Sequence, residues 1–248
     1  MTSDAEPTPR SSSDSPTDAV PGGLERVLAL SGIAFAVLLV LGWFMSGGDA
    51  PDYTAANEDW VDWAESNRSR GGIGAFLTLL AGFAFLHFAG TIRSVLGRAK
   101  TTVRGSAQLA HVAFAGAITG IVGITMAIVM IGAATSVGAD AEPLVSRAVT
   151  TASAGPYLVA TMGFATMLAA SGLLTLQTGV FARWTGIVAL LGAVAFLMTF
   201  STLLEGTGED SLGGYGFLPG ILALVIWSIA TSAARYRALT SPAIPNSS

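Results

Sequence analysis

The stretch VLALSGIAFAVLLVLGWFM, residues 27–45, decides the class of this protein. It contains no charged side chain, and a helix of its length covers about 28 Å, close to the ~30 Å hydrocarbon core of a bilayer. The run is longer than the apolar part of a secretory signal peptide. We therefore interpret it as an uncleaved signal-anchor helix that spans a membrane.

Further apolar runs follow it, and each is long enough to cross the hydrocarbon. With the first, they cover about residues 27–45, 72–94, 106–136, 155–178, 184–204 and 215–236. Hydrophobic residues make up 52% of the chain and charged residues only 11%, against roughly 25% charged residues in soluble domains. Mean hydropathy is +0.63. The sequence predicts an all-α polytopic membrane bundle of six transmembrane helices.

The distribution of Lys and Arg predicts the orientation of this bundle, because cytoplasmic loops are enriched in basic residues. If the spans alternate, nine of the twelve Lys and Arg residues lie on the side of the two termini. We expect both termini in the cytoplasm, with a six-helix domain over residues 24–237. The Ser-, Asp- and Pro-rich residues 1–23 and the short segment 238–248 are expected to be disordered cytoplasmic tails.

The segment 46–71 is the largest external piece, and it is acidic. Trp60, Val61, Trp63 and Ala64 form an apolar stripe that predicts a short amphipathic helix. Such a helix either lies on the outer leaflet, where Trp is favoured, or caps the bundle. A second short external helix is expected over Pro143–Thr151.

Small residues recur at helical spacing in several spans. Gly116 and Gly120 form one GxxxG pattern, and Gly216 and Gly220 form another. Such patterns allow close approach of helix backbones. They favour packing within the bundle, with contact to a second copy or to another membrane subunit as the alternative.

The residue types exclude much chemistry. There is no Cys, and no Asp, Glu, Lys or Arg lies well inside a predicted span. Ion-coupled transporters usually carry such a group in the membrane. No P-loop, dinucleotide fingerprint or zinc-protease motif occurs, and no basic patch suits nucleic acid. We predict no catalytic residues and no metal site, and we expect a non-enzymatic structural or accessory component that contacts the lipid bilayer.

The only two histidines are the most notable polar feature of the spans. His87 and His111 each lie about 9 Å from the cytoplasmic end of consecutive antiparallel helices, with Gln108 and Gln177 at a similar level. Three interpretations remain open. The histidines form hydrogen bonds between helices; they ligate a b-type haem or a metal; or the four residues line a ligand pocket of a small-molecule or lipid transporter or binder near the cytoplasmic side.

Three short elements carry a resemblance to known proteins: Glu65-Ser-Asn-Arg68, Arg93-Ser-Val-Leu-Gly-Arg98 and Thr178-Gly-Val-Phe-Ala-Arg183-Trp-Thr-Gly186. With the overall pattern of spans over residues 24–237, they resemble a broad group of actinobacterial multi-pass membrane proteins of unknown function. The resemblance implies the same topology and a bacterial cytoplasmic (inner) membrane. It implies no activity, cofactor or site residue.

Overall fold

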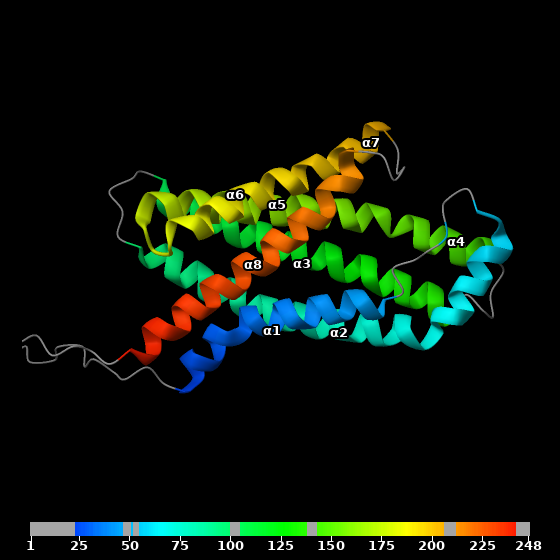
Figure 1. Cartoon of the computed structure of the whole chain (residues 1–248), viewed down its shortest axis with the longest axis horizontal. Coiled ribbons are helices and arrows are strands. Elements are labelled where there is room, and N and C mark those ends of the chain that lie inside the picture. The colour runs from blue at the N-terminus through cyan, green and yellow to red at the C-terminus, as the bar shows by residue number, and fades with distance from the viewer. Residues whose placement is uncertain are drawn as a thin grey trace, which may run out of the picture.

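The computed structural model describes residues 23–46, 51, 55–99, 105–137, 143–205 and 212–241. The described residues form helices and turns, with no strand among them (Figure 1). In chain order the helices are α1 (Gly23–Met45), α2 (Asn57–Arg98), α3 (Ser106–Val137), α4 (Pro143–Ala152), α5 (Ala154–Thr178), α6 (Arg183–Met198), the 3-10 helix η1 (Thr199–Ser201), α7 (Thr202–Glu205) and α8 (Leu212–Thr240).

Six segments are long and apolar enough to cross a membrane, which confirms the predicted fold class. They lie in α1, α2, α3, the α4–α5 pair, α6 and α8. The chain is therefore an integral membrane protein built as a helical bundle. The first 22 residues and residues 242–248 lie outside the described part, but α8 continues to Thr240, so the start of the predicted C-terminal tail is helical.

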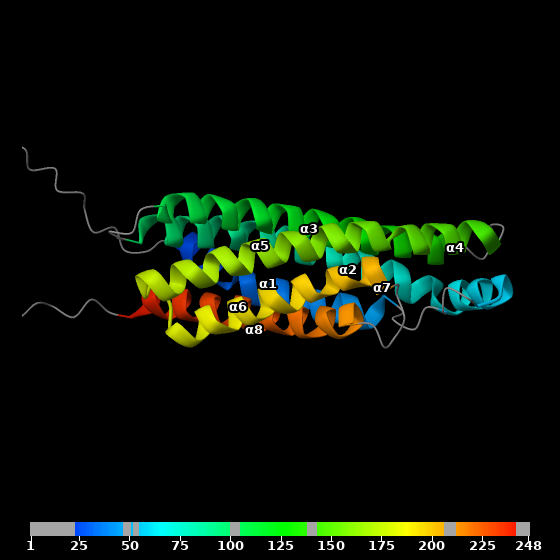
Figure 2. The same ribbon diagram turned by 90° about the horizontal axis from the view of Figure 1, so that it is seen from above.

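The spans pack in a closed ring in the order α1, α2, α3, α5, α6, α8 and back to α1. Sequential helices run antiparallel, so α1 begins and α8 ends at one end of the bundle, here named the termini end (Figures 1 and 2). The opposite end, where α4 lies, is named the far end. This ring determines which faces of each helix remain available to lipid.

Glycines set the closest helix contact, between α3 and α5. A Cβ atom on Gly116 would lie 2.7 Å from the carbonyl oxygen of Gly163, and one on Gly163 would lie 2.6 Å from the Cα atom of Gly120. The pattern at Gly216 and Gly220 packs in the same way against Ala195 and Phe196 of α6. The predicted packing within the bundle is confirmed, and both stripes are covered inside one chain.

The external segment before the second span differs from the prediction. Residues 57–71 do not form a separate amphipathic helix, because α2 runs without a break from Asn57 to Arg98. Its 42 residues measure about 63 Å, roughly twice the hydrocarbon thickness. The N-terminal part of α2 therefore projects past the other spans, together with α4, and both views show this extension (Figures 1 and 2).

The extension has a small core of its own. Trp60, Trp63 and Ala64 are buried and pack with Ile131 of α3. The two indole rings meet edge to face, 6.1 Å apart. The apolar stripe thus caps the bundle, which was one of the two predicted alternatives. The second short helix expected over Pro143–Thr151 is present as α4, which begins at Pro143 as predicted and ends at Ala152.

Two local features shape the ends of the later helices. Gly179 ends α5 with a φ of 65°, a left-handed conformation that favours glycine, and its N–H donates to the Thr175 carbonyl oxygen at 2.9 Å. Helix α8 starts earlier than expected, so Pro219 lies inside it rather than in its first turn. Because proline lacks an N–H, the carbonyl group of Tyr215 has no partner in the helix ladder. This weakens α8 near the far end.

Candidate functional site

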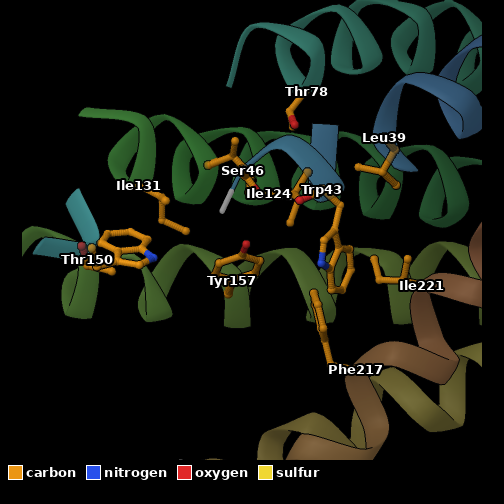
Figure 3. A pocket seen from close by; sticks show the side chains of 12 residues that line it. Leu39, Trp43, Ser46, Thr78, Ile124, Ile131, Thr150, Tyr157, Phe217 and Ile221 are labelled. Carbon is orange, nitrogen blue, oxygen red and sulfur yellow. Dashed lines mark hydrogen bonds between the residues drawn. The ribbon is translucent and has the colours of Figure 1, made fainter. Parts of the chain in front are cut away.

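A cavity of about 170 Å³ lies in the far half of the bundle (Figure 3). Helices α1, α2, α3, α4, α5 and α8 all contribute to its wall. The apolar and aromatic lining residues are Leu39, Trp43, Trp63, Ile124, Ile128, Ile131, Tyr157, Phe217 and Ile221. The hydroxyl-bearing ones besides Tyr157 are Ser46, Thr78 and Thr150. The cavity is thus mainly apolar, with a few polar groups, as is usual for small-molecule sites.

Aromatic rings form one side of the cavity. The ring of Phe217 lies 5.4 Å from that of Trp43 and 5.6 Å from that of Tyr157, centroid to centroid, and it meets Tyr157 edge to face. Figure 3 shows Phe217 directed towards Trp43 and the Tyr157 hydroxyl directed away from α5 into the same space. Phe217 therefore joins α1, α5 and α8 at this level.

Three hydroxyl groups in the cavity wall already donate hydrogen bonds to the backbone. Thr78 donates to Gly74 at 2.9 Å, Thr150 to Ser146 at 3.0 Å, and Ser46 to Trp43 at 2.8 Å, in each case to a carbonyl oxygen of the same helix. Towards the cavity these oxygens are available only as acceptors. They favour a ligand that carries a hydrogen-bond donor.

Trp63 adds a hydrogen-bond donor to these acceptors. Its side chain is only 8% exposed, and its indole Nε1–H has no acceptor among the described residues. A buried N–H without a partner costs about 1–3 kcal/mol. Trp63 is part of the cavity wall, and its N–H is a donor without a partner that an oxygen atom of a bound molecule would satisfy once the indole ring turns towards the cavity.

The cavity lies beside the seam between α1 and α8. The two helices separate towards the far end, as Figure 1 shows. At that level the cavity wall includes Trp43 of α1 with Phe217 and Ile221 of α8, which flank Pro219. The Trp43–Phe217 contact thus bridges the divergent part of the seam.

The four residues predicted to form a polar site near the termini end do not line this cavity. His87, Gln108, His111 and Gln177 are all exposed on the surface of the bundle. The Nδ1 atom of His87 pairs with the Phe83 carbonyl oxygen at 2.9 Å, and that of His111 with the Ala107 carbonyl oxygen at 2.6 Å.

Each histidine is thus paired within its own helix. None of the four residues lines the far-end cavity or either of two further cavities among the described residues. No group of three or more metal-ligating side chains occurs among the described residues. The ligand and haem alternatives at these positions remain predictions.

Comparisons of this chain with protein-family models, with curated proteins and with solved structures found no match. The function of the chain is therefore inferred from the geometry of the bundle. Sequence reasoning did not find the far-end cavity. The sequence did carry one signal, because Trp43, Thr78 and Tyr157 each have a polar group and lie at a similar depth in three spans. Whether these side chains face one another depends on the rotation of each helix about its axis.

Proposed function

We propose that this chain is a non-enzymatic accessory protein of the membrane that holds a small amphipathic molecule in its far-end cavity. The observation that carries the proposal is the unpartnered, buried N–H of Trp63 in the wall of a mainly apolar cavity. Holding this donor without an acceptor disfavours the empty state. A ligand oxygen at this position stabilises the protein, so the site is suited to binding.

The size of the cavity limits the ligand class. A cavity of roughly 150 Å³ lined by Leu, Ile and Phe is known to hold benzene, and this one measures about 170 Å³. The occupant is therefore a single ring or a short branched chain, or the terminal part of a longer lipid. It carries one oxygen that accepts from Trp63 and a hydroxyl hydrogen that donates to Ser46, Thr78 or Thr150.

A binding role is favoured over catalysis or ion-coupled transport. Apart from the Tyr157 phenol, no lining residue is ionisable, and coupling to protons or ions relies on such groups in the membrane. The site also lies at the opposite end from the polar site that the two histidines suggested. Any contact with other subunits uses surfaces other than the covered glycine stripes at residues 116–120 and 216–220.

The proposed setting is a bacterial cytoplasmic membrane, with the termini end inside. The support is the basic-residue asymmetry of the loops and the resemblance of residues 24–237 to actinobacterial membrane proteins. In this orientation the cavity lies in the outer half of the bilayer. Its ligand would then enter laterally from the outer leaflet through the α1–α8 seam.

The test compares p-cresol with toluene as probes of the detergent-solubilised full chain. Both should raise the unfolding temperature, and p-cresol should bind about tenfold more tightly because its oxygen pairs with Trp63. Trp63→Phe should remove this preference while leaving toluene binding intact. Trp184→Phe, a change at an exposed tryptophan of α6, is the matched control. Equal p-cresol preference in all three proteins would refute the proposal.

A further inference from the structure

A second, open cavity of about 350 Å³ lies at the termini end, between α1, α2, α8 and the turn after α5. It is independent of the far-end cavity, with no lining residue in common. Its wall carries the three charged groups Glu25, Arg98 and Arg235.

These charges come from three different helices. Arg98 is the last residue of α2, Arg235 lies in the last turns of α8, and Glu25 lies in the first turn of α1. Among the described residues, neither guanidinium forms an ion pair, with Glu25 or with any other carboxylate. Two guanidinium groups and one carboxylate leave the cavity wall with a net charge of +1. The two guanidinium groups favour an anion with several oxygen acceptors, because each can donate two parallel hydrogen bonds.

The other residues of the cavity wall indicate which kind of anion fits. The hydroxyl groups of Thr91 and Ser94 donate to the His87 and Gly90 carbonyl oxygens, at 3.0 and 3.1 Å, so their oxygens are left as acceptors. Leu28 contributes apolar surface beside them. A ligand that combines phosphate oxygens, a hydroxyl or ammonium donor and an apolar portion matches this wall.

The depth of this cavity along the bundle also favours a ligand with a phosphate group and an apolar portion. The apolar part of α2 ends at Arg93, Arg98 ends the helix about one and a half turns later, and the basic end of α8 lies at the same end of the bundle. This is the level of the lipid headgroups on that side of the bilayer. Basic pockets between helix ends bind phospholipid headgroups in membrane proteins.

We propose that this cavity binds the phosphodiester headgroup of a membrane phospholipid. Arg98 and Arg235 donate to the phosphate oxygens from two sides. Glu25, Thr91 and Ser94 accept hydrogens from the hydroxyl or ammonium group of the headgroup. Leu28 packs against the glycerol and the start of the acyl chains. The site thereby links α1, α2 and α8 through one lipid molecule.

Native mass spectrometry of the full chain tests this proposal, with phosphatidylglycerol and diacylglycerol as probes added to the delipidated protein. The wild type should retain phosphatidylglycerol at least tenfold better than diacylglycerol, which lacks the phosphate. Arg98→Gln and Arg235→Gln should each weaken retention of phosphatidylglycerol about tenfold. Arg237→Gln, at an exposed arginine of α8 that does not line the cavity, should leave it unchanged.

Two results would overturn the proposal. One is retention of phosphatidylglycerol in both Gln variants at the level of Arg237→Gln. The other is its complete displacement by millimolar inorganic phosphate, which would show a site for small anions instead. If a Gln variant does not fold, as judged by far-UV circular dichroism, Arg98→Lys replaces it. That variant keeps the charge but loses the bidentate geometry, and a several-fold loss is expected. Unchanged retention in Arg98→Lys would contradict the bidentate contact.

Discussion

The indole ring of Trp43 in α1 and the phenyl ring of Phe217 in α8 lie 5.4 Å apart, at the level where these two helices diverge. Both rings line the far-end cavity. Phe217 also meets Tyr157 of α5, so a single side chain connects the seam to the opposite wall. Closure of the cavity and stability of the bundle therefore share one residue.

Replacing Phe217 tests its roles in bundle stability and in closure of the cavity separately. Phe217→Ala removes its contacts with Trp43 and Tyr157 and should lower the free energy of unfolding by about 2 kcal/mol, less than for a fully buried Phe because the ring is half-buried. It should also speed the release of bound p-cresol. Unfolding in mixed micelles and stopped-flow release measure the two effects. Leu218→Ala, at the neighbouring lipid-exposed position, should change neither, and equal effects in both variants would contradict this role.

The close contact between α3 and α5 makes a strong prediction about glycine. Gly163→Leu should prevent the native packing, since a Cβ there meets the backbone of Gly120, and we expect a loss of more than 3 kcal/mol or no folded protein. Gly90→Leu in α2 should be tolerated, because no atom lies within 4 Å of a Cβ at that position. Yields of monodisperse protein and thermal unfolding give the comparison. Normal stability of Gly163→Leu would show that the two helices do not approach in this way.

The extension should open separately from the membrane bundle. Trp60 is only 1% exposed and packs the first turns of α2 into the small core against Ile131 of α3, and these turns also contact α4. Trp60→Ala should increase amide hydrogen exchange across the first turns of α2 and across α4, with little change in the middle of α5. Local opening of this kind is expected where a small core is joined to the main one through few residues, here Ile131. Uniform acceleration along the whole chain would contradict a separate cap.

Absence of cysteine makes the orientation easy to measure. Ala56→Cys lies just before α2 at the far end, and Ala182→Cys lies just before α6 at the termini end; both positions are exposed. A membrane-impermeant maleimide added to intact cells should label Ala56→Cys and should label Ala182→Cys only after permeabilisation. The reverse pattern would place the termini outside and would move the far-end cavity to the inner leaflet.

The spans could be predicted because hydropathy alone determines which segments enter a bilayer. The expected start of the third span and the end of the fourth, at residues 106 and 178, coincide with α3 and α5. The long α2 was missed for a physical reason. Polar residues such as Arg68 and Arg70 mark where a helix leaves the membrane, but they do not stop it.

The rotation of each helix could not be predicted in the same way. In a soluble helix, apolar residues mark the buried face, but here lipid-facing and core-facing residues are both apolar. The depth of His87 and His111 therefore follows from counting residues, whereas their exposure follows from packing. The same limit hid the cavity, since Trp43 near the C-terminal end of α1 and Tyr157 near the N-terminal end of α5 meet Phe217 only in the folded ring.

Fluorine NMR of 4-fluorophenol with the detergent-solubilised full chain tests the central claim most directly. A saturable resonance from one bound molecule per chain should appear with the wild type and with Val129→Phe, a change at an exposed position of α3. It should disappear in Ile131→Phe, which places a larger side chain in the cavity wall two residues further along. Binding of equal strength in all three proteins would contradict the claim that the far-end cavity is the ligand site.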